Sequence, residues 1–378
     1  KENKAFISAL VYGVTEKKIT LDYFIDKYAQ GRIKPKVRIV LWLGAYQLLF
    51  MDKVPSSASI NESVKLVKEI KQDYYSKLVN AVLHKIDNDR QIPDDLSVKY
   101  SVPENLINMW KKQYGEDVLN EFLPCINDKP PLFAIPNKKF VNSDELLYEL
   151  ECDGILGEAY DEFVLIENAN DLTDSKAFKN GLFYIEDLSS FNCANALDAL
   201  GDDLVLDMCS APGGKAFTIS QSMNNSGKIY CYDLHEHRLN LIKNSAKRLS
   251  IDNIYTDVND ATVYNENIPK ADKILCDVPC SGFGIIRRKP EIRYKDLDSV
   301  KDLPQIQYKI LETSSRYLKD GGRIIYSTCT LNKKENENVV NKFLKDHSGY
   351  KLLKDKTVFP STVGGDGFYY AIMVKNEN

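Results

Sequence analysis

Residues 204–215 read Leu-Val-Leu-Asp-Met-Cys-Ser-Ala-Pro-Gly-Gly-Lys, an apolar run that leads into an acid, a proline and two glycines. The apolar run is typical of a buried strand, which Asp207 would end. Gly213 and Gly214 allow a backbone to approach a ligand closely. The stretch therefore predicts a strand followed by a cofactor-binding loop, although a glycine pair alone is also typical of an ordinary strand–helix turn. It is not a phosphate-binding P-loop, because Ala216 stands where Ser or Thr is required.

The sequence around this stretch alternates between strand-like and helix-like runs from about residue 180 to the end. The strand-like runs are 204–206, 228–232, 273–276, 323–326 and 369–374. Such alternation predicts a doubly wound, mostly parallel α/β sheet, in which ligands bind at the carboxyl ends of the strands. Pro212, Asp233, Pro279 and Cys329 each follow a predicted strand, so we expect them to meet at one edge of the sheet.

Two cysteines stand in tight motifs after predicted strands. Cys280 lies in Asp277-Val-Pro-Cys-Ser-Gly282, and Cys329 lies in Tyr326-Ser-Thr-Cys-Thr330. Two thiols beside one cofactor loop suggest a covalent group-transfer enzyme, in which one thiol attacks and the other helps to finish. The other reading is a buried structural cysteine, which fits five of the other six thiols better: Cys125, Cys152, Cys193, Cys231 and Cys276.

Composition limits the class of protein. The 378 residues are 43% apolar and 28% charged with a net charge of −4, as in a globular protein of two or three domains. No apolar run is long enough to span a membrane, no signal peptide is visible, and the cysteines show no C-x-x-C spacing, which favours a reducing cytoplasmic location. His235 and His237 lack partners at metal-ligand spacing, so we expect no metal site.

The N-terminal third reads as helical. Apolar residues recur at helical spacing up to about residue 128, and Ser59-Ile-Asn-Glu62 has the form of a capping box. Pro130-Pro131 marks a boundary. The following segment mixes strand-like runs at 132–135 and 163–166 with a helix-like stretch near 143–150. We therefore predict three domains: an all-α bundle (1–128), a small α+β connector (129–178) and the α/β domain (179–378).

Residues 181–378 resemble the RNA 5-methylcytosine methyltransferases, which use S-adenosylmethionine on a Rossmann-like fold. The resemblance follows motifs in order: the loop 207–215, Asp233 with Arg238-Leu239, the Cys280 and Cys329 motifs, Gly321-Gly322 and Gly367-Phe-Tyr369. Residues 181–190 are similar to a further family segment, with Glu186 where Gln is usual. Lys334-Glu-Asn336 stands where Glu-Glu-Asn is common. Residues 55–68 and 75–86 resemble the NusB-like helical domain, and this combination is similar to the RsmB (Sun/Fmu) family, which methylates C5 of a cytosine in small-subunit (16S) ribosomal RNA.

The chemistry of cytosine explains why such an enzyme needs these residues. C5 is a poor nucleophile until a thiolate adds to C6, and a group that protonates or hydrogen-bonds N3 makes the ring electrophilic. The resemblance implies that Cys329 is the nucleophile, that Cys280 acts in release and that Lys215 contacts the base. Asp277 is our candidate for the N3 contact, as a buried acid with a raised pKa. In DNA cytosine-C5 enzymes the Pro-Cys thiol attacks instead, which leaves the reverse assignment open.

The remaining expectations concern the cofactor and the RNA. The predicted S-adenosylmethionine-binding residues are Cys209, Ser210, Ala211, Pro212, Gly213, Gly214, Lys215, Asp233, Arg238, Asp260 and Asp277, with Asp257 as the alternative to Asp260 beside the adenine. Arg287, Arg288 and Lys289 open a basic run, 287–295, that is predicted to contact phosphates. Other readings are a transfer RNA methyltransferase and a catalytically inactive RNA-binding protein. We expect a monomer, small-subunit ribosomal RNA as the partner and no membrane association.

Overall fold

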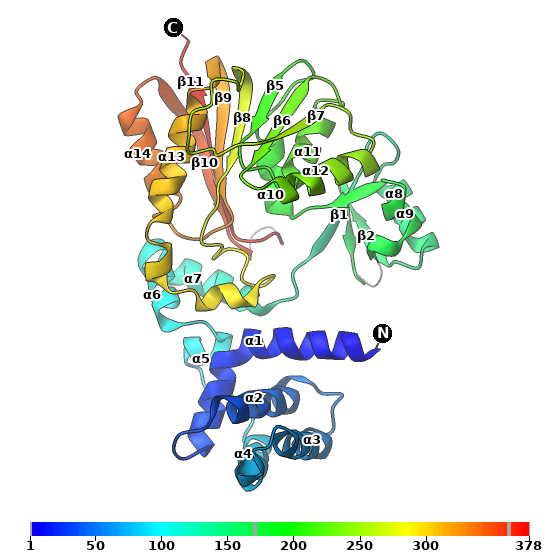
Figure 1. Cartoon of the computed structure of the whole chain (residues 1–378), viewed down its shortest axis with the longest axis vertical. Helices are drawn as coiled ribbons and strands as arrows, with labels where there is room; N and C mark the ends of the chain where they lie inside the picture. Colours follow the sequence, from blue (N-terminus) through cyan, green and yellow to red (C-terminus); the bar gives the residue numbers. More distant parts are fainter. Residues whose placement is uncertain (1, 169–171, 361–363, 378) are drawn as a thin grey trace. The chain divides into compact units, whose positions relative to one another are not determined.

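The computed structural model describes residues 2–168, 172–360 and 364–377, which form two compact units (Figure 1). The helical unit comprises the residues up to Asp128 together with Lys289–Lys295. The sheet unit comprises Lys129–Arg288 and the residues from Asp296 onward. None of the helices among the described residues is long and apolar enough to cross a membrane.

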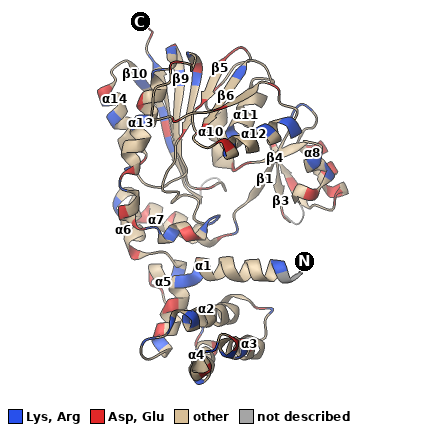
Figure 2. Cartoon of the chain, in the orientation of Figure 1, with Lys and Arg blue, Asp and Glu red and all other residues tan. Residues whose placement is uncertain are grey.

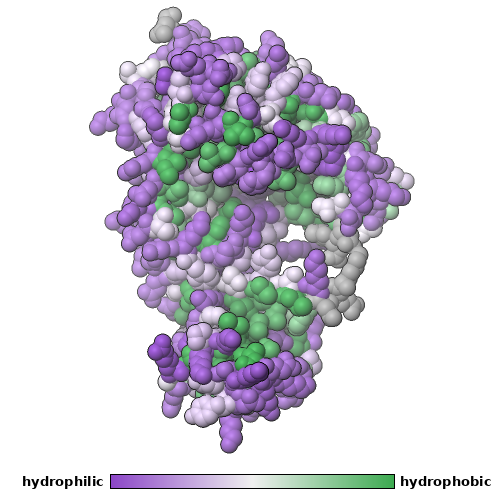
Figure 3. Space-filling view, viewed as in Figure 1, coloured by the Kyte–Doolittle hydropathy of each residue, from purple (hydrophilic) through white to green (hydrophobic). Residues whose placement is uncertain are grey.

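The helical unit confirms the prediction of an all-α N-terminal region. Its elements are α1 (Glu2–Tyr28), α2 (Pro35–Phe50), α3 (Ser56–Glu69), η1 (Asp73–Tyr75), α4 (Ser76–Asn88), α5 (Leu96–Tyr100), α6 (Glu104–Tyr114), α7 (Glu116–Phe122), η2 (Leu123–Asn127) and η4 (Pro290–Tyr294). Apolar stripes of the first four α-helices make its main core. Figure 3 shows apolar residues gathered over the region of α1, where Phe6, Ile7, Val11 and Tyr12 are exposed.

The predicted capping box at Ser59 is wrong. Helix α3 begins three residues earlier, at Ser56, directly after Pro55. Ser59 therefore lies inside the helix, where it is buried and donates its hydroxyl to the carbonyl of Gly44 on α2 at 3.1 Å. The Ser59 hydroxyl therefore binds a carbonyl on another helix and does not cap the start of its own helix.

The segment Lys289–Lys295 belongs to the helical unit although it comes from the middle of the α/β region. Arg293 is 1% exposed, and its Nη1 donates to the carbonyls of Glu16 and Ser101 at 2.9 and 3.0 Å. The Tyr294 hydroxyl donates to the carbonyl of Thr15 at 2.8 Å. Burial lowers the pKa of Arg293. The end of the basic run is therefore part of a protein core, and the prediction of phosphate contacts is wrong for Arg293.

The connector forms a four-stranded antiparallel sheet of order β2-β3-β1-β4. Its elements are β1 (Leu132–Pro136), α8 (Ser143–Cys152), β2 (Gly157–Tyr160), β3 (Phe163–Ile166), η3 (Leu172–Asp174), α9 (Lys176–Lys179) and β4 (Phe183–Ile185). Asn142 and Glu145 form a capping box at the start of α8. Strand β4 lies beyond residue 178, where the predicted connector ends. The sheet of the connector therefore includes one strand from the predicted α/β domain.

The large sheet has seven strands in the order β10-β11-β9-β8-β5-β6-β7. The five strands from β9 to β7 are parallel, and β11 runs antiparallel to its neighbours β9 and β10. The elements are α10 (Leu188–Asn195), β5 (Leu204–Asp207), α11 (Gly214–Ser222), β6 (Lys228–Asp233), α12 (Glu236–Arg248), β7 (Ile254–Val258), β8 (Ala271–Asp277), η5 (Leu297–Val300), α13 (Leu303–Ser315), β9 (Leu318–Thr328), α14 (Glu337–Asp346), β10 (Tyr350–Val358) and β11 (Phe368–Lys375).

Two apolar cores cover the two faces of this sheet. Residues of α10, α11 and α12 pack in one cluster, and residues of α13 and α14 pack in the other. The predicted mostly parallel, doubly wound fold is thereby confirmed. The parallel strands end at Asp207, Asp233, Val258, Asp277 and Thr328, and the pairing of Asp277 with Ser327 places the last two ends side by side.

Candidate active site

Backbone hydrogen bonds to neighbouring strands hold the glycine-rich loop after β5. The amide of Met208 donates to Leu275 on β8 at 3.0 Å, and the amide of Ser210 donates to Tyr232 on β6 at 2.8 Å. Gly213 adopts a φ of 106°, and a Cβ there would lie 2.9 Å from the ring of Phe217. Only glycine fits this position without strain, so the sequence specifies the loop shape directly.

Arg238 ties the loop to the end of β6. Its Nη2 donates to the carbonyl of Ala211 at 2.7 Å, and its Nη1 lies 2.8 Å from Asp233 Oδ2. Asp233 is 3% exposed and also accepts the amide of His235 at 3.1 Å. Arg238 thus positions the predicted ribose acid against the loop, a role that the sequence did not reveal.

Buried polar atoms near these strand ends test whether a polar cofactor fits. Among the residues that the structure describes, Asp207 Oδ1 and Asn259 Nδ2 are buried with no hydrogen-bond partner. Burial raises the pKa of Asp207 to about 7. Buried polar groups are normally paired, so an acceptor and a donor left over here fit a ligand rich in polar groups, such as S-adenosylmethionine. The backbone amide of Asn259 donates to the carbonyl of Asp233 at 3.1 Å. Asn259 was not among the cofactor-binding residues predicted from the sequence.

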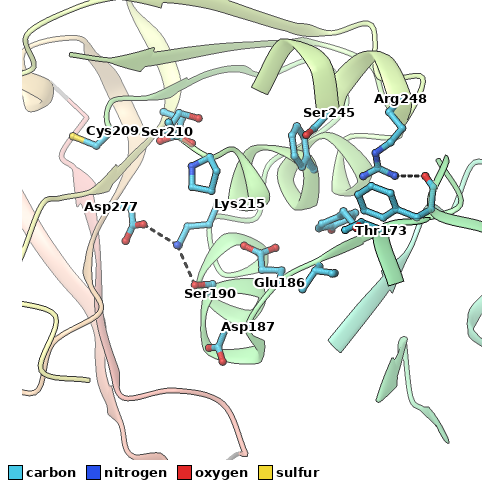
Figure 4. Close-up of a pocket in the computed structure, with 18 residues that line it drawn as sticks. Thr173, Glu186, Asp187, Ser190, Cys209, Ser210, Lys215, Ser245, Arg248 and Asp277 are labelled. Atoms are coloured by element: carbon cyan, nitrogen blue, oxygen red, sulfur yellow. Dashed lines mark hydrogen bonds and ion pairs between the residues drawn. The ribbon is translucent and has the colours of Figure 1, made fainter. Parts of the chain in front are cut away.

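A cavity of about 400 Å³ adjoins the loop (Figure 4). Seven of the eleven predicted cofactor residues line it: Cys209–Pro212, Gly214, Lys215 and Asp277. Lys215 Nζ donates to Asp277 Oδ2 at 2.8 Å and to Ser190 Oγ at 3.1 Å. Although burial opposes the charge, Asp277 and Glu186 raise the pKa of Lys215 above its usual value. Lys215 is therefore a partly buried cation held at the cavity wall.

Asp277 accepts hydrogen bonds on both oxygens. Lys215 donates to one, and the hydroxyl of Ser327 donates to the other at 2.8 Å. Because Ser327 lies two residues before Cys329 and Cys280 lies three residues after Asp277, this carboxyl connects the cavity to both thiol motifs. The assignment of Asp277 and Lys215 to the base stays a prediction.

Glu186 is a second buried carboxyl at the cavity wall. It is 8% exposed, and its Oε2 accepts the hydroxyl of Thr218 at 2.6 Å. Burial raises the pKa of Glu186 from its ordinary value of 4.5 to about 7, although Lys215 opposes the shift. The charge of this group, and with it the charge balance around Lys215, changes near neutral pH.

Replacement of Glu186 by Gln is expected to change the pH dependence of stability. A carboxyl whose pKa is raised on folding stabilises the fold fully below its unfolded pKa, and this contribution is lost as pH rises through about 7. Glu186→Gln imitates the protonated acid. Between pH 5 and 8 the wild type should lose on the order of 2–3 kcal/mol of unfolding free energy relative to the variant. Urea denaturation across this range measures the difference, and parallel curves would contradict it.

The two motif thiols face each other. Cys280 Sγ lies 3.3 Å from Cys329 Sγ, and both side chains are partly buried and free of disulfides. The hydroxyls of Ser281 and Thr330 are hydrogen-bonded at 2.7 Å, and the amide of Gly284 donates to the carbonyl of Cys329 at 3.0 Å. The hydrogen bond with Cys329 and burial raise the pKa of Cys280. The two thiols interact directly and therefore titrate as a pair, and the assignment of attack to one and release to the other stays a prediction.

The two acids considered for the adenine both lie at the surface. Asp260 Oδ1 accepts the amide and the hydroxyl of Thr262, and Asp257 Oδ1 accepts the amide of Val258. Each has a second carboxylate oxygen available, and the choice between them stays a prediction.

The first two residues of the basic run, Arg287 and Arg288, form ion pairs inside the sheet unit. Arg287 has a side-chain exposure of 5%, lies 2.7 Å from Asp366 and donates to the carbonyl of Gly364. Arg288 pairs with Asp366 and Asp187 and donates to the carbonyl of Pro131 at 2.9 Å. These arginines hold the segment before β11 against the rest of the unit. Both arginines are thus engaged in ion pairs within the unit, whereas Lys289 is exposed, and their contacts with phosphate stay a prediction.

No group of three or more His, Cys, Asp or Glu side chains suited to a metal ion occurs in the described part of the chain. His235 and His237 stack on each other, with ring centroids 5.5 Å apart.

The sheet order, the glycine-rich loop and the acid after β6 define the Rossmann-like fold of a methyltransferase. Residues 194–374 match the model of the 16S rRNA methyltransferase RsmB/F family, and residues 1–88 match the NusB family. The crystal structure of PH0851 superposes with a TM-score of 0.83 over 98% of this chain and 90% of that chain, at 28% identity.

Curated relatives extend over nearly the full length. The probable ribosomal RNA small subunit methyltransferase B of Bacillus subtilis is 33% identical over 99% of this chain and 91% of its own length. The corresponding Synechocystis protein is 30% identical over 92% of this chain and 82% of its own length. The chain therefore belongs to the ribosomal RNA small subunit methyltransferase B family, whose members are S-adenosylmethionine-dependent methyltransferases.

Proposed function

We propose that the protein methylates C5 of a cytosine in small-subunit ribosomal RNA through a covalent bond between Cys329 and C6 of the base. The observation that carries the proposal is the 3.3 Å contact between Cys280 and Cys329. This contact follows the end of β8 at Asp277, whose carboxylate accepts a hydrogen bond from Lys215 on α11. A buried structural pair of thiols needs no adjacent lysine–carboxylate pair, whereas activation of a pyrimidine ring needs polar groups at its edge.

The residues of the chain divide the reaction into two parts. Cys329 attacks C6 as a thiolate, which makes C5 electron-rich, while Lys215 and Asp277 hold the polar edge of the ring. When bound, S-adenosylmethionine supplies an electrophilic methyl group and is left as S-adenosylhomocysteine. After C5 carries the methyl group, its proton passes to water, the C5–H electrons restore the C5–C6 double bond, and the C6–S bond breaks with the electrons returning to Cys329. Cys280, at 3.3 Å from Cys329, assists this second part. The cytosine must be unpaired or flipped, because a stacked base hides its C6 face.

A direct assay tests the activity. The purified protein is incubated with labelled S-adenosylmethionine and small-subunit ribosomal RNA, and the product is examined by bisulfite sequencing. One or a few cytosines that resist conversion are expected, with transfer RNA as the comparison substrate. Methyl transfer to another base atom, or preferential labelling of transfer RNA, would contradict the proposal.

The cations at the C-terminal end of α12 are our candidates for phosphate contacts (Figure 2). Lys139, Lys243 and Lys247 are exposed, and residues 237–251 contain no Asp or Glu. Lys139 Nζ donates to the carbonyl of Ser250 at 3.0 Å, which places it at the end of this helix. Arg248, which stacks on Phe178 at 3.8 Å, lines the cavity that contains Lys215. We propose that phosphates flanking the target base lie on this surface.

Replacement of Lys139, Lys243 and Lys247 by Ala is expected to weaken RNA binding and to flatten its salt dependence by a slope of about 0.7–0.9 per lost contact. The matched control replaces Lys351, Lys354 and Lys356 by Ala. These lysines are exposed on the edge strand β10, and their replacement removes the same total charge. Binding titrations at several salt concentrations measure both. Equal loss of slope in the two triple variants would show an effect of net charge alone.

A further inference from the structure

Glu335 is a fully buried carboxylate at the junction of the two thiol motifs. It is 0% exposed. Its Oε2 accepts the amide of Ser281 at 2.8 Å and the side-chain amide of Gln307 at 2.9 Å. Its Oε1 accepts the hydroxyl of Ser281 at 2.5 Å and the side-chain amide of Asn332 at 2.8 Å. All four groups, from three residues, are donors, so the two acceptor oxygens of the carboxyl group match the cluster completely.

The partners of Glu335 hold both neighbours of Cys280. Ser281 is bound to Glu335 through its amide and its hydroxyl. Gln307, on α13, donates at the same time to Glu335 and to the carbonyl of Pro279 at 3.0 Å. Cys280 itself makes none of these contacts, so its thiol is aimed by its two neighbours.

The next residue holds both neighbours of Cys329. Asn336 Oδ1 accepts the hydroxyl of Thr328 at 2.6 Å, and Asn336 Nδ2 donates to the carbonyl of Thr330 at 2.8 Å. Glu335 and Asn336 are adjacent in the chain, so the supports of the two thiol motifs share one backbone segment. The hydroxyl of Tyr326 fixes that segment further by donating to the carbonyl of Glu335.

We propose that Glu335 is a positioning residue that sets the distance between the thiols of Cys280 and Cys329. The inference rests on the proposed function only for its catalytic consequence. The thiols must lie close enough for release to follow attack, and errors of about an ångström in such geometry can cost on the order of 100-fold in rate. Among the described contacts Glu335 makes no hydrogen bond with either sulfur, although its charge helps to raise the pKa of Cys280. Its positioning contacts are those with Ser281, Gln307 and Asn332.

Replacement of Glu335 by Gln tests the acceptor requirement with little change of volume. The backbone N–H of Ser281 can only donate, so the oxygen of the new side chain must stay opposite it. The new NH₂ group would then face Asn332 Nδ2, and two donors would point at each other. If Asn332 flipped to accept instead, its oxygen would turn away from the amide of Lys334. Either rearrangement loosens the segment that carries Glu335 and Asn336, which supports both thiol motifs.

The first measurement reads the thiol distance without any methyl transfer. Diamide, which takes up the two thiol hydrogens, is added to the full-length protein, and mass spectrometry follows the linked Cys280–Cys329 peptide. We expect linkage to be at least fivefold slower in Glu335→Gln than in wild type. The control is Asn253→Ala, which removes the buried hydrogen bonds of Asn253 with Ser220 and Ser226 in another part of the sheet unit and should leave the rate unchanged.

The second measurement is steady-state methylation. We expect kcat to fall at least tenfold in Glu335→Gln with KM for S-adenosylmethionine within twofold of wild type, because Glu335 contacts no residue of the loop 207–215 among the described hydrogen bonds. Linkage at the wild-type rate, or equal slowing in Asn253→Ala, would overturn the positioning role. Slow linkage in Glu335→Gln together with a wild-type protein that does not methylate cytosine would leave that role intact and refute the proposed function.

Discussion

Replacement of Cys329 by Ala is expected to abolish both methyl transfer and the covalent protein–RNA species. The attack on C6 precedes every other bond change, so loss of the attacking sulfur stops the reaction before any bond forms. The residual rate should be at least about 1,000-fold below wild type, as for other essential nucleophiles. Labelled methyl transfer and denaturing gel electrophoresis of protein with RNA measure the two effects. Cys152→Ala, which removes an exposed thiol, is the control.

Replacement of Cys280 by Ala should have the opposite effect on the adduct. Cys329 can still attack and C5 can still be methylated, but release is blocked, so a protein–RNA species that survives denaturation should accumulate. A trapped species in Cys329→Ala and none in Cys280→Ala would reverse the two roles.

Replacement of Asp233 by Ala is expected to reduce affinity for S-adenosylmethionine at least 100-fold. The side chain is buried at the end of β6, where an acid commonly binds the ribose hydroxyls of a nucleotide. Its loss also leaves Arg238 without its carboxylate partner, and Arg238 holds the carbonyl of Ala211 in the loop. The variant therefore loses a ligand contact and loop support together.

Isothermal titration calorimetry measures this loss. The control is Asp272→Ala, which also removes a carboxylate, here one that pairs with Lys319 and accepts the amide of Leu204 at the start of β5. The control should bind the cofactor as wild type does. Unchanged affinity in Asp233→Ala, with both variants folded by circular dichroism, would refute the assignment.

The sequence predicted the strands whose burial depends on apolar runs and missed those at the edges of the sheets. Strands β5, β6, β8, β9 and β11 each contain such a run. Strand β7 is mostly exposed, and β10 reads Tyr-Lys-Leu-Leu-Lys-Asp-Lys-Thr-Val, with four charges in nine residues. Charged edge strands resist unwanted pairing between molecules, but the same charges hide them from pattern analysis. Their pairing is decided by neighbours such as β6 and β11.

Local motifs predicted the parts of the candidate site that depend on backbone shape. The glycine loop after β5 and the two cysteine motifs each lie at a strand end, as their spacing requires. The partners of the charged residues could not be predicted from local sequence. Arg287 and Asp366 are 79 positions apart in the chain, and Ser281 and Glu335 are 54 positions apart. Such pairs form only when the fold brings distant segments together, so the basic run looked free and Glu335 looked incidental.

Because Lys289–Lys295 belongs to the helical unit, no single position in the sequence separates the two units. A fragment that stops at Asp128 would lack η4 and leave the carbonyls of Glu16 and Ser101 without Arg293. A fragment that starts at Lys129 would carry Arg293 and Tyr294 with none of their partners. Recombination that exchanges the helical region for another would have to alter the chain nine residues after Cys280 as well. The two units are thus constrained to be inherited, expressed and engineered as one piece.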